Sequence, residues 1–228
     1  MRAKTWSIRI LSFAGIAFLV ACGGGGGGGY GGGGGGGPVV LFEDDFSSGT
    51  FDRWITNIAG ATIDGAYGNA IPSAQFFKAA GSGTTAGKIT ANVNFDPTGG
   101  LSFTAHVSNR STSLDGQLLM FLNTSNGTNT CLAAANVHRT LVQYELRNGG
   151  SRPLANNAIT PDTSWHTYVL IIQPNGAMTW YRDGSPQLST PAYAGCVNAV
   201  NVLKLEISSA GTSSDEIYFN LDNVEVAR

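Results

Sequence analysis

The chain has 228 residues, of which 42% are hydrophobic and 12% are charged, and its formal net charge is −2. This composition excludes an intrinsically disordered chain, and the lack of a lysine and arginine cluster argues against binding of nucleic acid or anionic lipid. When the N-terminal segments described below are set aside, about 190 residues remain, enough for one domain with a well-buried core.

Residues 1–21 have the pattern of an export signal. Arg2, Lys4 and Arg9 give a basic start, and an apolar run follows at residues 10–20. This run is shorter than the about 20 apolar residues that cross a bilayer as a helix. We therefore predict a cleaved signal peptide rather than a retained membrane anchor.

The sequence LVAC at residues 19–22 resembles a bacterial lipobox. The resemblance implies that Cys22 becomes the mature N-terminus and carries fatty acyl chains, of which two or more are needed for stable anchoring. Gly23 follows the cysteine where a retention signal would have Asp, a pattern that resembles sorting to the outer membrane. We therefore expect a lipid-anchored protein of the bacterial cell envelope, held in the outer membrane through acylated Cys22.

Residues 22–38 consist almost entirely of glycine, interrupted by Tyr30 and ended by Pro38. Glycine has no side chain to bury and has great backbone freedom, so we predict a flexible tether with an average span of about 20 Å. The folded domain is expected to occupy residues 39–228.

Two more cysteines, Cys131 and Cys196, lie in this domain. Because an exported chain meets an oxidising compartment, we predict a disulfide between them, with two buried free thiols as the alternative. Neither cysteine has a cysteine or histidine nearby at zinc-ligand spacing, so a metal site at these residues is not expected.

The rest of the chain reads as short strands separated by clusters of Gly, Asn, Pro, Asp and Ser, a pattern typical of an all-β sandwich or jelly roll. Asn175-Gly176 and Asp183-Gly184 are predicted to supply the positive φ angles of two hairpin turns. The expected strands lie within residues 88–95, 101–109, 117–123, 140–147, 165–173, 177–184, 201–208 and 216–226.

Four segments carry a resemblance to a known family: LFEDDFSSGTFDRW at 41–54, YGNAIPS at 67–73, WHTYVLIIQPNGAMTWYRDG at 165–184 and LDNVEV at 221–226. They resemble the concanavalin A-like lectin/glucanase superfamily, which includes laminin-G-like domains and laminarinase-type glycoside hydrolases. The resemblance implies a jelly roll of two antiparallel sheets, one of them concave. Because this superfamily includes enzymes, lectins and adhesins, the fold does not decide the function.

The hydrolase branch of the superfamily carries E-x-D-x-x-E on one strand, where period-two spacing puts the first two carboxylates on one face. This sequence lacks the motif: Glu145 is followed on its face by Arg147, and Glu206 by Ser208. We therefore expect a protein that is not an enzyme and that needs no organic cofactor.

The resemblance also implies a structural calcium ion that joins the first and last strands. Asp45 and Asp222 match the expected acidic positions, and Glu43 is a further candidate ligand. Calcium prefers six to eight oxygen ligands, many of them backbone carbonyls that a sequence does not reveal. The alternative is that these carboxylates only hydrogen-bond to turns at the sheet edges.

Polar residues on the predicted strands are the candidates for ligand binding. Gln143, Glu145 and Arg147 share one strand face, which is either a sugar-binding surface or simply a solvated face. Trp180 and Tyr181 point to opposite faces, so that one stacks on a sugar while the other fills the core; Trp54 and Trp165 are expected in the core. The candidate ligand-binding residues are Gln143, Glu145, Arg147, Trp180 and His138.

Three functions are compatible with these observations. The first is a non-catalytic surface lipoprotein that binds a glycan or another extracellular polymer. The second is a structural or protein-binding envelope lipoprotein without a sugar site, and the third is a polysaccharide-degrading enzyme with an unrecognised site. An exposed aromatic ring beside Gln143 and Glu145 would favour the first, whereas paired carboxylates about 5–9 Å apart would favour the third.

Overall fold

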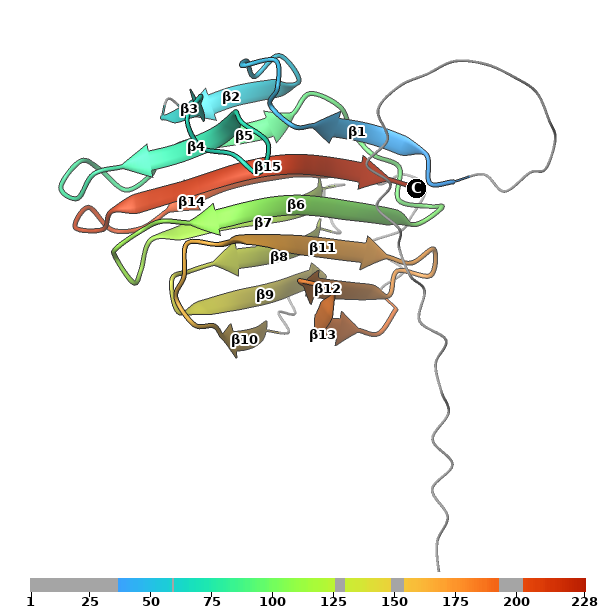
Figure 1. Ribbon diagram of the computed structural model, residues 1–228. Coiled ribbons are helices and arrows are strands. Elements are labelled where there is room, and N and C mark those ends of the chain that lie inside the picture. Colours follow the sequence, from blue (N-terminus) through green and yellow to red (C-terminus); the bar gives the residue numbers. More distant parts are fainter. Residues whose placement is uncertain (1–36, 59, 126–129, 149–153, 193–202) are drawn as a thin grey trace, which may run out of the picture. The chain divides into compact units, whose positions relative to one another are not determined.

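The computed structural model describes residues 37–58, 60–125, 130–148, 154–192 and 203–228 (Figure 1). Residues 36–228 form one compact unit. The described part of the chain consists of strands and turns, and it contains no helix long and apolar enough to cross a bilayer.

The strands form two antiparallel sheets, which we call sheet A and sheet B. Sheet A has the order β13-β12-β11-β6-β15-β4-β3, and β1 pairs with the C-terminal half of β15. Figure 1 shows this sheet in front. Its strands are β1 (Val40–Asp44), β3 (Ala61–Asp64), β4 (Ser73–Lys78), β6 (Leu101–Asn109), β11 (Trp165–Ile172), β12 (Met178–Arg182), β13 (Ser185–Thr190) and β15 (Ile217–Ala227).

Sheet B lies behind sheet A in the same view and has the order β10-β9-β8-β7-β14-β5-β2. Four strands that follow one another in sequence, β7 to β10, are neighbours in this sheet. The strands are β2 (Trp54–Ile58), β5 (Lys88–Ala91), β7 (Gln117–Ser125), β8 (Thr130–Val137), β9 (Leu141–Asn148), β10 (Leu154–Ala158) and β14 (Lys204–Ala210).

The core lies between the two sheets and follows directly from period-two alternation. Leu101, Phe103, Ala105 and Val107 of β6 are all buried, and the residues between them face away from the core. Trp180 of β12 contacts aromatic rings from both layers, because its ring centroid lies 6.2 Å from Phe103 in sheet A and 5.9 Å from Tyr144 in sheet B. The predicted two-sheet sandwich is therefore confirmed.

Both predicted hairpin turns are present, with one correction. Asp183 and Gly184 have φ angles of 50° and 76°, as expected. In the other turn only Gly176 has a positive φ, of 83°, and Asn175 instead uses its side-chain Oδ1 to accept a hydrogen bond from the N–H of Ala177. A four-residue turn closed by the N–H of Gly176 and the carbonyl of Gln173 needs only one left-handed residue.

The tryptophans expected in the core divide between the core and the surface. Trp54 is buried against Phe42 and Phe46, so its prediction is confirmed. Trp165 is only partly buried, because its register opposite Ser108 puts it on the outer face of sheet A. There it stacks on Tyr67, with the ring centroids 5.5 Å apart.

Candidate functional site

His166, in the motif at residues 165–184, forms a structural clamp with two aspartates. His166 Nδ1 lies 2.7 Å from Asp183 Oδ2, its Nε2 lies 3.0 Å from Asp162 Oδ1, and the N–H of Thr167 donates to Asp183 Oδ1. Each ring nitrogen of His166 thus faces a carboxylate oxygen within hydrogen-bond distance. The motif thus ties the β12–β13 turn and the segment before β11 to one histidine.

Acid is expected to loosen this clamp. Burial raises the pKa of Asp162, but hydrogen bonds from His166 and from the N–H of Ser164 outweigh this effect and hold the pKa below its ordinary value. A carboxylate with a lowered pKa adds stability above its unfolded pKa of about 3.9, and this stability is lost as the pH falls through the folded value.

We therefore expect Asp162→Asn to lower the free energy of unfolding at pH 7 and to match the native protein below about pH 3. The loss should be small, because 41% of the Asp162 side chain is exposed to screening solvent. Urea unfolding at pH 7, 5 and 3 measures it, with Asp52→Asn as the control for losing an exposed carboxylate. A difference that persists unchanged at pH 3 would contradict the assignment.

The outer face of sheet B carries two of the predicted ligand-binding residues, Gln143 and Glu145. Val142, Tyr144 and Leu146 of β9 are buried in the core, whereas Gln143 and Glu145 lie on the outer face and are partly exposed. The shared face predicted for Gln143 and Glu145 is therefore confirmed. Arg147 lies on the same strand opposite Leu132, and its side chain lies outside the described residues.

An aromatic residue that the sequence analysis did not select lies in the middle of this face. Phe121 of β7 is partly exposed, and the strand register aligns it with Ala134 of β8 and Glu145 of β9. Its strand neighbours Met120 and Leu122 point into the core. The alternation in QLLMFLN shows that both faces of that strand are apolar and that only one can be buried between the sheets, but it does not show which one.

Asn136 of β8 provides an unsatisfied polar group beside this ring. The residue is only 7% exposed, its Nδ2 lies 3.4 Å from Glu145 Oε1, and its buried Oδ1 has no hydrogen-bond partner among the described residues. Gln143 is its register partner on β9. A buried amide oxygen without a partner is costly, so this atom is suited to accept a hydrogen bond from a ligand.

His138 lies at the end of the same polar strip. Burial lowers its pKa, and a hydrogen bond that the ring donates to Gln143 partly opposes this shift. Its buried Nε2 also has no partner within the described part of the chain. The structure thus places His138 beside Gln143, and its role in ligand binding stays a prediction.

Trp180 does not belong to this face, and its prediction as a ligand-binding residue is wrong. It is 2% exposed, and its register opposite Leu170 points it between the sheets. Tyr181, the next residue, faces the other way and is partly exposed. Sequence alternation showed that the two rings lie on opposite faces but did not show which face is inside.

The two glutamates on the described outer face of sheet B, Glu145 and Glu206, lie far apart. The register runs from Glu206 through Phe121 and Ala134 to Glu145, so three interstrand steps separate their Cα atoms by about 14 Å. Glu206 is also paired with Lys88, at 2.5 Å.

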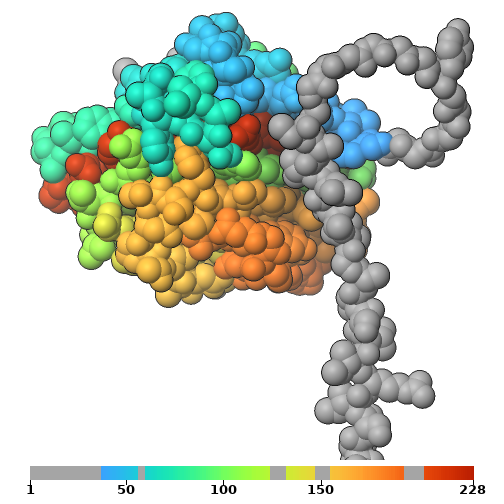
Figure 2. Space-filling view, in the orientation of Figure 1, coloured from blue at the N-terminus to red at the C-terminus, as the bar shows by residue number. Residues whose placement is uncertain are grey.

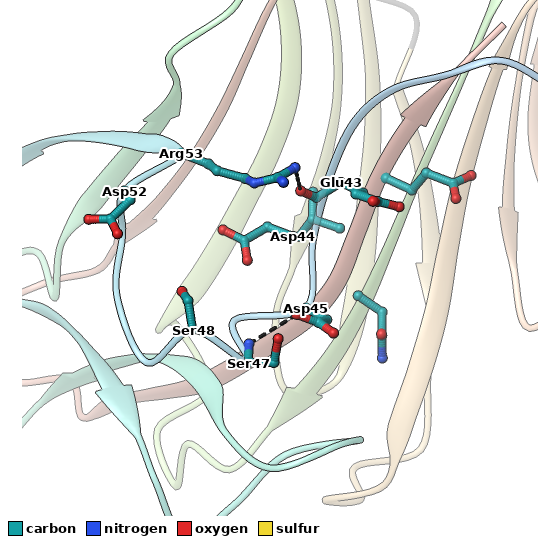
Figure 3. A pocket seen from close by; sticks show the side chains of 10 residues that line it. Glu43, Asp44, Asp45, Ser47, Ser48, Asp52 and Arg53 are labelled. Atoms are coloured by element: carbon teal, nitrogen blue, oxygen red, sulfur yellow. Dashed lines mark hydrogen bonds between the residues drawn. The ribbon is translucent and has the colours of Figure 1, made fainter. Parts of the chain in front are cut away.

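The predicted metal ligands are not gathered in one place. Glu43 and Asp45 line a cleft of about 590 Å³ beside β1, shown in Figure 3, together with Asp52 and Glu225. Asp222 is not part of its lining. Among the described residues, no three His, Cys, Asp or Glu side chains form a group that could hold a metal ion.

The carboxylates of this cleft have local structural partners. Asp44 accepts hydrogen bonds from the N–H of Phe46 and from Nε1 of Trp54, at 2.8 and 2.7 Å. Asp45 accepts from the N–H of Ser47, a bond that Figure 3 marks. Hydrogen bonds from Ser47 lower the pKa of Asp45. Asp45 thus caps a turn, as the alternative expects, while the calcium site stays a prediction.

The predicted lipidation site and disulfide stay predictions. Cys22 and Cys196 lie outside the described residues. Cys131 belongs to β8, opposite Thr124, and its side chain lies outside the described residues as well.

Comparison with known proteins supports the fold. No family model and no curated protein matches the chain. Solved structures do match. A GH16 protein from the mixed-linkage glucan PUL of Bacteroides ovatus, in complex with a G4G4G3G product, has 12% identity and a TM-score of 0.61, covering 82% of this chain and 100% of its own.

Two further solved structures also match the chain. The carbohydrate recognition domain of Emp46p in a potassium-bound form has 13% identity and a TM-score of 0.57, covering 82% of this chain and 93% of its own. A pseudo β-1,3-glucanase of Mycobacterium tuberculosis has 13% identity and a TM-score of 0.59, covering 82% and 98%. The chain therefore has the concanavalin A-like jelly-roll fold, as the sequence motifs predicted.

Proposed function

We propose that the outer face of sheet B binds a polysaccharide without cleaving it, on a protein held at the bacterial envelope by lipid on Cys22. The observation that carries this proposal is the position of Phe121, partly exposed and aligned in register with Glu145 across β8. Aromatic rings offer an apolar face to a sugar ring, and a few fixed polar groups beside them orient it.

The polar groups of this face support the same proposal. Asn136 Oδ1 is buried and has no hydrogen-bond partner among the described residues, while Gln143 and Glu145 on the next strand are partly exposed. Sugar hydroxyls both donate and accept hydrogen bonds, so they complement amides and a carboxylate. Two structural neighbours, the carbohydrate recognition domain of Emp46p and the GH16 protein in complex with its G4G4G3G product, point to the same class of ligand.

The residues of this face also support binding without hydrolysis. The outward residues of β8 whose side chains are described, Leu132, Ala134 and Asn136, include no acid or base. Glu206, one of the two glutamates on the described outer face, is paired with Lys88, and Glu145 lies within hydrogen-bond distance of Asn136.

Residues 36–228 tested on a glycan array and on insoluble polysaccharides would examine this proposal. We expect selective retention, and binding about 5- to 30-fold weaker in Asn136→Ala, since the ligand loses the hydrogen bond of a buried group. Asn94→Ala, which truncates an exposed asparagine after β5, is the matched control. Silence of folded protein on every glycan would favour the structural or protein-binding alternative.

Two further readouts separate the remaining alternatives. Release of new reducing ends from a bound polysaccharide would contradict the non-catalytic proposal and favour an enzyme. Incorporation of labelled palmitate that disappears in Cys22→Ser would support the anchor, whereas a protein that is secreted free of lipid would contradict it.

A further inference from the structure

Asp222 of β15 lies at the centre of a network of backbone donors. Its side chain is fully buried. Oδ2 accepts hydrogen bonds from the N–H groups of Asn69 and Ala70, at 2.8 and 3.0 Å, and Oδ1 accepts from the N–H of Asn223, at 2.7 Å. Asn223 has a φ of 47°, and the β6–β15 register shifts at this point. The bulge therefore turns the N–H of Asn223 towards the carboxylate.

The segment that supplies two of these donors covers the outer face of sheet A. Residues 65–72 connect β3 to β4, and Figure 2 shows this part of the chain lying against the segment that precedes β11. Tyr67 holds it there, because its hydroxyl donates to the carbonyl of Thr163 and its ring stacks on Trp165. Asp222 lies beneath this segment and fastens its middle.

Three backbone N–H groups favour the anionic form of Asp222, although burial outweighs them and raises its pKa. Three N–H groups point at its two oxygens, and His106, its register partner on β6, has a pKa that burial lowers, against the partly opposing charge of Asp222. His106 Nδ1 lies 2.5 Å from Asn69 Nδ2 and so is the acceptor of that contact. N–H groups present the positive ends of their dipoles, which attract a carboxylate and repel a cation.

A calcium ion does not fit these residues. It requires six to eight oxygen ligands at about 2.3–2.6 Å, and the oxygens of Asp222 are instead directed at nitrogen donors. Asp45 and Glu43, the other predicted ligands, line the separate cleft beside β1. The arrangement differs from the ion site that the family resemblance implies.

We propose that Asp222 replaces the family's structural cation: its carboxylate anchors residues 65–72 through backbone hydrogen bonds, and the fold needs no divalent ion. Asp222 stands at the position that the family resemblance assigns to a metal ligand. Its carboxylate is instead held by backbone amides. This inference is independent of the sugar-binding face, which lies on the opposite sheet.

Thermal unfolding of the purified full chain in EDTA and in millimolar calcium tests the proposal. We expect the same Tm in both solutions, within about 1 °C, because an ion that binds only the folded state would raise it. Asp222→Ala should lower the Tm by about 5–15 °C in both solutions, since three buried N–H groups lose their acceptor. Asp222→Asn should have an intermediate effect, because its single oxygen can still accept from Asn69 and Ala70.

Asp45→Asn is the matched control and should leave the Tm unchanged, since its exposed carboxylate caps only one turn. If Asp222→Ala does not fold, hydrogen exchange of native protein in EDTA gives the answer, with slow exchange expected at the amides of Asn69 and Ala70. A saturable calcium-induced rise in Tm that Asp222→Asn abolishes would overturn the proposal. So would an Asp222→Ala protein with the native Tm, or unprotected amides at residues 69 and 70.

Discussion

Replacing Trp180 with alanine is expected to lower the free energy of unfolding by about 3–5 kcal/mol, the range for large aromatic residues truncated in a core. The ring is 2% exposed and packs between Phe103 of sheet A and Tyr144 of sheet B. Backbone hydrogen bonds on both sides of β12 hold the strands in place, so the cavity left by the ring cannot collapse fully.

Urea unfolding of Trp180→Ala measures the loss of unfolding free energy. Tyr181→Ala, measured in the same way, is the matched control. Tyr181 is the adjacent residue and points to the outer face of the same strand, so its truncation should cost about 1 kcal/mol or less. The opposite pattern, in which Trp180→Ala is as stable as Tyr181→Ala and loses glycan binding, would restore Trp180 as a ligand contact and contradict the structure.

Phe121→Ala is expected to weaken binding of a polysaccharide about tenfold or more, with little change in stability. An aromatic ring at the centre of a binding face commonly contributes more than 1.4 kcal/mol, which corresponds to a factor of ten. The ring is already partly exposed, so its removal leaves no closed cavity. Isothermal titration with the best glycan from the array measures the effect.

Two variants sharpen this experiment. Phe121→Tyr keeps the ring and should retain binding. Phe77→Ala removes a phenyl ring that is 45% exposed on sheet A, where it contacts Tyr218, and should bind like the native protein. Equal affinity of Phe121→Ala and native protein would show that the sugar does not stack on this face.

The motifs that made the fold recognisable turn out to hold loops. Asp44 of the first motif binds Trp54 and the N–H of Phe46, Asp222 of the last motif binds three backbone amides, and His166 joins Asp162 to Asp183. Each is a short polar contact between segments that strand pairing alone leaves loose. The residues that make such contacts depend on how the fold arranges its loops. They can therefore identify a fold without identifying a ligand.

The candidate site has the opposite character. Its residues come from three strands: Phe121 from β7, Asn136 from β8, and Gln143 and Glu145 from β9. No sequence motif spans residues of more than one of these strands. Alternation along β9 was enough to place Gln143 and Glu145 on one face. It was not enough to find Phe121, because a phenylalanine in an apolar strand looks like core until the partner sheet is known.

By itself the sequence determined the fold class, the hairpin turns and the strand faces, because turn chemistry and period-two alternation are local properties of the chain. Only the tertiary structure decided which of two faces is buried: it put Trp180 between the sheets and Phe121 outside. It also decided that Asp222 meets the amides of residues 69 and 70 rather than Asp45 and Glu43. The physical reason is that strand order and register bring together residues about 150 positions apart, and no local pattern specifies those pairings.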